Sequence, residues 1–152
     1  MTRVLVAGIG NLFFGDDGFG VELARRLAAS PPPRARVVDY GIRAVHLAYE
    51  LLEPLDLLVV ADCVSRGGAP GSLYLIEPDG DELAGGATGD AHGMNLPIVF
   101  ATVRELGGAL PPTFVVGCEP ETLDLGMGLS AAVAGVLPAA ADLVRELIAS
   151  RP

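Results

Sequence analysis

The stretch from Val4 to Val21, VLVAGIGNLFFGDDGFGV, decides the fold of this 152-residue chain. An apolar run ends in two glycines, and a short loop with two adjacent acids, Asp16 and Asp17, leads into a helical pattern. We expect residues 3–7 to form a strand that is buried on both faces, and the glycines to allow a tight turn after it. The two acids then lie at the carboxyl end of the first strand, where open α/β sheets place their sites.

The rest of the chain alternates between strand and helix patterns, which is typical of a three-layer α/β/α domain with a mostly parallel sheet. Two of the predicted strands have no helix between them, so we expect that one strand can run antiparallel. Residues 79–90 are rich in glycine, and we expect a loop that moves on binding. The further strands are predicted at 35–39, 57–61, 72–76 and 113–117, and the helices at 20–29, 43–52, 95–106 and from Ser130 onward, with a kink or break at Pro138.

Length and charge limit the function. A chain of 152 residues suits a single domain spanning 1–152. It carries 10 Lys and Arg against 19 Asp and Glu, for a net charge of -9, which disfavours binding to nucleic acid or to an anionic membrane. No apolar run is long enough to span a membrane, and the first run breaks at Gly8, so it predicts a strand and not a signal peptide. We expect a cytoplasmic monomer.

Three residues are candidates for a shared site: Asp17, Asp62 and His92. Asp17 follows the first strand, Asp62 ends the strand at 57–61, and His92 lies in the loop before the third helix. Strands in these positions are often neighbours, with a crevice between their carboxyl ends. Two carboxylates and an imidazole form a ligand set suited to nickel, zinc, iron or manganese, and they leave positions on the metal open.

Each candidate also has a purely structural interpretation. Asp17, and still more Asp16, can cap the following helix, and Asp62 can cap the turn after its strand. A histidine in a glycine-rich loop, such as His92, can simply be solvated. We interpret His46 as a partly exposed helical residue without a function, and Asp39 as a residue that can hold the turn at Gly41.

Two other chemistries fit the sequence poorly. Gly8-Ile9-Gly10 with the later Asp39 mimics a dinucleotide-binding fingerprint, but Phe13 stands where the third glycine belongs, and two carboxylates would face the pyrophosphate. A nucleophilic pair of Cys63 and His92 is conceivable, but Cys63 adjoins Asp62 and alternation turns it to the other side of the strand. We expect Cys63 and Cys118 to be free buried thiols.

Seven short motifs occur in order along nearly the whole chain: GIGN at 8–11, GDDGFGV at 15–21, DYG at 39–41, VVAD at 59–62, AHGM at 91–94, GCEPE at 117–121 and GLS at 128–130. In these motifs the chain resembles the maturation endopeptidases of nickel-iron hydrogenases. The resemblance implies an α/β fold with a twisted five-stranded sheet between helices. It also implies a protease that removes a short C-terminal extension from a hydrogenase large-subunit precursor.

In this family, cleavage follows nickel insertion, and nickel already in the precursor is the recognition element. The resemblance therefore implies that nickel comes with the substrate and that no organic cofactor is needed. Asp17, Asp62 and His92 match the family's metal-contacting positions. Two alternatives remain open at this stage: a nickel-sensing or chaperone module for the same precursor that does not cut it, and a metallohydrolase that holds its own zinc.

Overall fold

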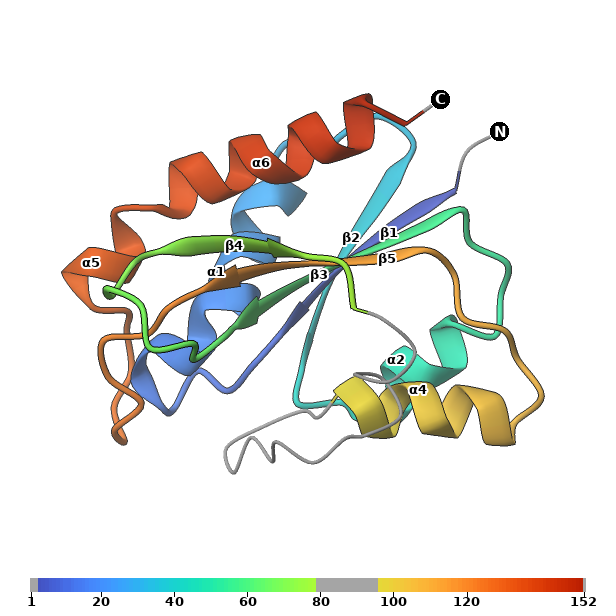
Figure 1. The fold of residues 1–152 in the computed structure, drawn as a ribbon, viewed down its shortest axis with the longest axis horizontal. Coiled ribbons are helices and arrows are strands. Elements are labelled where there is room, and N and C mark those ends of the chain that lie inside the picture. Colours follow the sequence, from blue (N-terminus) through green and yellow to red (C-terminus); the bar gives the residue numbers. More distant parts are fainter. Residues whose placement is uncertain (1–2, 79–95, 152) are drawn as a thin grey trace.

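The computed structural model describes residues 3–78 and 96–151. Within them, five strands form a twisted sheet in the order β2-β1-β3-β5-β4, and helices cover both of its faces (Figure 1). The predicted three-layer α/β/α architecture is confirmed. The strands are β1 (Val4–Ile9), β2 (Ala35–Gly41), β3 (Leu57–Cys63), β4 (Leu73–Ile76) and β5 (Thr113–Cys118).

The helices divide between the two faces of the sheet. One face packs against α1 and α6, which contact each other, and the other face packs against α2 and α4 (Figure 1). A 3-10 helix, η1, precedes α1 and was not expected from the sequence. The helical segments are η1 (Gly15–Gly18), α1 (Phe19–Ala28), α2 (Ala44–Glu50), α4 (Leu96–Glu105), α5 (Ala131–Ala134) and α6 (Leu137–Ala149).

The strand directions follow the prediction, with one detail that the sequence did not indicate. β2, β1, β3 and β5 run parallel, and β3, whose first five residues are all apolar, lies at the centre of the sheet. β4 is the antiparallel strand, and it pairs with β5 at the edge and not with β3, its neighbour in sequence. The chain that follows β3 therefore passes the position of β5 before it enters the sheet as β4.

Alternation along the buried strands builds two cores. In β3, Leu57, Val59 and Ala61 pack into the core beneath α1 and α6, whereas Leu58 and Val60 pack into the core beneath α2 and α4. All five are buried, which explains why these successive positions are all apolar and not only every second one. Full burial of such side chains contributes about 1.5–3 kcal/mol each.

Helix α1 packs closely against the sheet at two glycines, Gly20 in the helix and Gly8 in β1. A Cβ atom on Gly20 would lie 2.1 Å from the carbonyl oxygen of Ala61 and 2.3 Å from that of Ile9, and one on Gly8 would lie 2.4 Å from the carbonyl oxygen of Gly20. Only glycine allows backbone to approach backbone this closely. This close packing holds the start of α1, and η1 before it, against the ends of β1 and β3.

The C-terminal helix is broken into two pieces, as predicted. Ser130 caps α5 and accepts a hydrogen bond from the Val133 N–H (3.3 Å). The break falls at 135–136, and Pro138 lies in the first turn of α6, where its missing N–H costs no helical hydrogen bond. Across the described ranges, no helix is both long enough and apolar enough to cross a bilayer.

The close approach of Gly20 to the sheet backbone yields a stability prediction. We expect Gly20→Ala to lower the free energy of unfolding by about 1–3 kcal/mol, because the added methyl group would overlap the Ala61 carbonyl oxygen and force α1 away from the sheet. Urea denaturation measures the change. Arg26→Ala, an exposed change on the same helix, is the control and should stay within about 0.5 kcal/mol of wild type. An unchanged Gly20→Ala protein would show that the close approach is not needed.

Candidate functional site

Asp17 is held inside η1 at the carboxyl end of β1. Only 2% of the residue is exposed, and its Oδ2 accepts a hydrogen bond from the Asn11 N–H (2.8 Å). Gly10 lets the loop fold back over it, because a Cβ at that position would lie 1.9 Å from the Asp17 carbonyl oxygen. The N-cap of α1 is Gly18, without a side-chain cap, so the capping interpretation of Asp17 is wrong.

Asp62 is the last residue but one of the neighbouring strand, β3, and lies at the same edge of the sheet. β1 and β3 pair directly, as predicted, and η1 contacts β3. Asp62 is half-buried, and its position in the strand puts it on the face of Leu58 and Val60, the side covered by α2 and α4. The structure thus brings the segments that carry Asp17 and Asp62 together.

The third candidate, His92, lies outside the described residues, as does the predicted loop at 79–90. In sequence it precedes Leu96, the first residue of α4, by four positions. Within residues 3–78 and 96–151, no three His, Cys, Asp or Glu side chains are grouped closely enough to hold a metal ion. The ligand set of Asp17, Asp62 and His92 stays a prediction. Carboxylates at this edge have the chemistry to bind a cation or to accept a proton.

Asp16 has a different role from its neighbour. It is completely buried, and its carboxylate accepts four hydrogen bonds from the segment between β5 and α5. Ser130 donates through its N–H (2.7 Å) and its hydroxyl (2.9 Å), and the N–H groups of Glu121 (2.8 Å) and Thr122 (3.2 Å) complete the set. Asp16 does not cap α1; it joins two loops that are more than 100 residues apart in sequence.

These contacts keep Asp16 ionised. Burial alone raises the pKa of the carboxyl, but the hydrogen bonds from Ser130, Glu121 and Thr122 together outweigh it, so the pKa lies below its usual value. The result is a buried negative charge, fully supplied with donors, directly beside Asp17.

A second buried acid, Glu119, holds the loop that follows Asp62. Its Oε1 accepts hydrogen bonds from the Tyr74 hydroxyl (2.6 Å) and from the N–H groups of Arg66 (2.8 Å) and Gly68 (3.0 Å). The Tyr74 hydroxyl is the main cause of a lowered Glu119 pKa, and the backbone donors add to it. Glu119 therefore fixes the loop at Arg66 and Gly68, which follows Asp62 along the chain.

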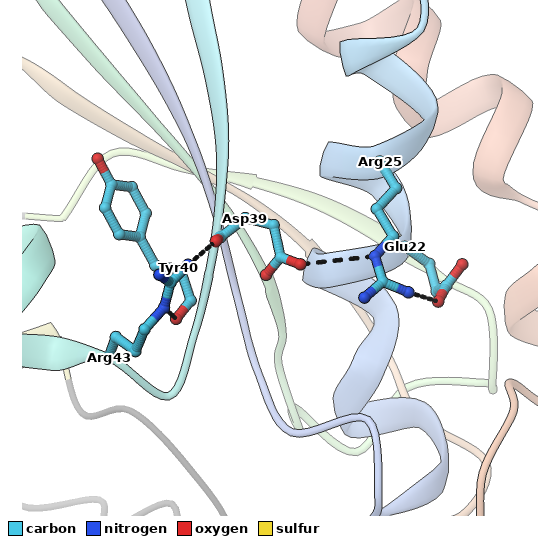
Figure 2. Close-up of polar contacts among 5 residues, drawn as sticks. All are labelled: Glu22, Arg25, Asp39, Tyr40 and Arg43. Carbon is cyan, nitrogen blue, oxygen red and sulfur yellow. Dashed lines mark hydrogen bonds and ion pairs between the residues drawn. The ribbon is translucent and has the colours of Figure 1, made fainter.

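Asp39 is occupied by a structural contact. Its Oδ2 lies 3.5 Å from Nε of Arg25, whose NH1 is 3.4 Å from Glu22 on the same helix (Figure 2). The guanidinium of Arg43 reaches back to the carbonyl oxygens of Asp39 and Tyr40 (Figure 2). These contacts tie the end of β2 to α1 and α2, which supports the structural interpretation of Asp39 over dinucleotide binding.

His46 and Tyr40 lie beside this contact. His46 is exposed on α2, as predicted, and its ring packs edge-on against Tyr40 with 5.7 Å between centroids. Tyr40 is fully buried in the core beneath α2 and α4, and burial raises the pKa of its hydroxyl, with the Glu50 carboxylate adding to the effect.

Cys63 and Cys118 form no disulfide, as predicted, but only Cys118 is buried; Cys63 is partly exposed. They face each other in register on β3 and β5. Burial raises the pKa of the Cys118 thiol to about 11, and the nearby Asp16 and Glu119 carboxylates reinforce the shift. A thiol with so high a pKa is a poor nucleophile, so Cys118 is suited to packing and not to covalent catalysis.

The structure is that of an α/β protein with acidic residues at the edge of the sheet where its parallel strands end. A family model described as hydrogenase maturation protease matches residues 21–147. The chain belongs to the hydrogenase maturation protease family, and it is accordingly a hydrolase of the peptidase type.

Individual relatives support the same assignment. The chain is 36% identical over 150 residues to the hydrogenase expression/formation protein HupD of Rhodobacter capsulatus, covering 95% of this chain and 71% of the relative. It is similar in structure to the hydrogenase maturating endopeptidase HybD from E. coli, with a TM-score of 0.83, 26% identity and coverage of 98% and 93%. The hydrogenase 2 maturation peptidase from Thaumarchaeota archaeon SCGC_AB-539-E09 gives a TM-score of 0.74 at 30% identity, with coverage of 97% and 99%.

Sequence reasoning missed the supporting acids of this edge. Glu119 directly follows the apolar strand β5, and an acid in such a position is the signal that indicates Asp62 as well. The partners of Asp16 carry no local signal, because the donors are mostly backbone N–H groups of a distant loop.

The Asp16 contacts yield a second prediction. We expect Asp16→Asn to lower the free energy of unfolding by about 1.5–3 kcal/mol, because the amide NH₂ cannot accept the hydrogen bonds that a carboxylate oxygen accepts. Asp124→Asn, an exposed change in the same distant loop, is the matched control and should remain close to wild type. Equal stability of both variants would contradict the structural role of Asp16.

The Glu119 contact yields a pH prediction. Because its folded-state pKa is depressed, ionised Glu119 stabilises the fold above its ordinary pKa of 4.5, and this contribution is lost as the pH falls through the folded-state pKa. Tyr74→Phe removes the main donor, so the stability lost in the variant should be largest near neutral pH and should shrink below pH 4.5. Urea unfolding at several pH values tests this, with the exposed Tyr49→Phe as control; a pH-independent difference would contradict it.

Proposed function

We propose that this peptidase removes the C-terminal extension of a nickel-iron hydrogenase large-subunit precursor after nickel has been inserted. The observation that carries the proposal is the placement of η1 with Asp17 against β3, which carries Asp62 near its carboxyl end, in a chain of this family. The names of its relatives, which include a hydrogenase maturating endopeptidase, support the same substrate class. We further propose that it acts in the cytoplasm as a monomer, with the precursor as its partner.

In this proposal the precursor's nickel is part of the substrate. Asp17 and Asp62 ligate it or act as the base that takes a proton from the attacking water, and His92 ligates it or orients the water. A metal ion next to the scissile bond polarises a carbonyl or lowers the pKa of a bound water. Two carboxylates and one imidazole are an incomplete ligand set, which suits recognition of a metal held mainly by another protein.

Two features of the edge support this role. Asp17 is buried and positioned by the Asn11 N–H, so its carboxylate does not need to be reorganised when substrate binds. The loops on either side are fixed by Asp16 and by Glu119. A preorganised edge of this kind is what a single, site-specific cut requires.

A processing assay tests the proposal. Purified protein is mixed with a hydrogenase large-subunit precursor, with and without nickel, and loss of the extension is followed by intact mass. We expect cleavage only with nickel present. Asp62→Asn and His92→Gln should slow it by about 100-fold or more, since each removes a ligand or a proton acceptor.

Asp142→Asn is the matched control, because this acid is exposed on α6, away from the edge. Processing at the wild-type rate by both Asp62→Asn and His92→Gln would overturn the residue assignment. Nickel-dependent binding without cleavage would favour a chaperone role. Stoichiometric zinc in the purified protein, with cleavage of precursor that lacks nickel, would favour a metallohydrolase.

A further inference from the structure

Three large apolar side chains are exposed beside the candidate site. Phe13 is 61% exposed, Leu125 79% and Met127 67%. They come from the loop after β1 and from the loop between β5 and α5, at the edge where the parallel strands end. A single exposed apolar residue is ordinary, but three on adjoining loops form a patch that needs an explanation. We call these three residues the loop patch.

The loop patch is built on a rigid base. Gly126 donates its N–H to the Phe13 carbonyl (2.7 Å) and accepts a hydrogen bond from the Gly15 N–H (2.9 Å), so the two loops pair as a short bridge. The four hydrogen bonds to Asp16 fasten the same loops immediately behind it. Because the backbone of these loops is already fixed, binding a partner costs the ordering of the side chains but little further loop ordering.

A pocket opens next to the loop patch. Its volume is about 310 Å³, and its apolar walls include Leu12 and Leu129, from the same two loops, and Leu137 from α6. Exposed apolar side chains beside an apolar pocket are the features at which interfaces concentrate their binding energy. The surface can therefore receive a partner that carries an apolar side chain of its own.

The surroundings of the loop patch are acidic. Glu121 and Asp124 are exposed in the loop that carries Leu125; Glu22, which pairs with Arg25, also lines the pocket. The whole chain has a net charge of -9. A second copy of this chain would bring the same acidic rim against the first, and like charges would oppose that contact. The complementary partner face is apolar at its centre and has Lys or Arg around it.

We propose that the loop patch is the docking surface for the body of the hydrogenase large-subunit precursor. This inference rests on the proposed function. The loop that carries Phe13 continues to Asp17 four positions later, so a protein seated on the patch has its adjoining segment at the candidate site. The precursor surface that binds here has protruding apolar side chains at its centre and basic residues around them, and it lies close to the C-terminal extension.

The test is steady-state processing of nickel-loaded precursor by the double variant Leu125→Asp, Met127→Asp. Both side chains are exposed, so the fold should be kept, and circular dichroism checks this. We expect KM to rise by about tenfold or more while kcat stays near wild type, because the change removes docking and leaves Asp17 and Asp62 in place. Val45→Asp with Ile98→Asp, on the exposed apolar side of α2 and α4, is the matched control and should leave KM unchanged.

The outcomes separate this inference from the proposed function. If wild type cleaves the precursor and the loop-patch variant has the wild-type KM, or the control variant has the raised KM, the docking surface is wrong and the function stands. If wild type does not cleave, the proposed function is wrong. The docking surface is then tested by binding to immobilised precursor: weaker binding by the loop-patch variant than by wild type and the control variant would support it, and equal binding by all three would overturn it. A wild-type dimer that the variant abolishes, seen by light scattering, would assign the loop patch to self-association and overturn the inference.

Discussion

The close approach of α1 to the sheet is the constraint on which the rest of the arrangement depends. No side chain separates Gly20 from the ends of β1 and β3, so the helix lies on backbone. Because η1 directly precedes α1 and contacts β3, Asp17 lies at the same edge of the sheet as Asp62, the last residue but one of that strand. Gly8 and Gly20 thus help to place the segment that carries Asp17 against the strand that carries Asp62.

Asp16 shows how two adjacent acids acquire separate tasks. Taking an ionised carboxylate out of water costs several kcal/mol unless hydrogen bonds replace its hydration. Asp16 receives four such bonds, and the cost of burial is offset by joining the loop after β1 to the loop before α5. Asp17 next to it is held by the first loop itself, through Asn11. Asp16 holds the two loops of the edge together, and Asp17 is positioned at the edge as a candidate site residue.

The sequence predicted the sheet well because the signals for it are local. Apolar runs bounded by glycine or proline located all five strands, and the positions of Asp17, Asp62 and His92 next to predicted strands and helices indicated the candidate residues, which the family motifs then matched. The helix caps were harder: an acid before a helix fits a cap equally well, yet Gly18 occupies that position and both acids have other partners. The pairing of β4 with β5 and the role of Glu119 depend on contacts between distant segments, which neither composition nor periodicity contains.

The hydrogen bond between Asp16 and Ser130 joins residues that are 114 positions apart. A ribosome adds about 5–20 residues per second, so roughly 6–23 seconds separate the synthesis of the two partners. During that interval the nascent chain has its first acidic loop but not the segment that fastens it. The edge is completed only after Ser130 has been made, so a chain that ends before this residue lacks the contacts that fasten the loop carrying Asp17.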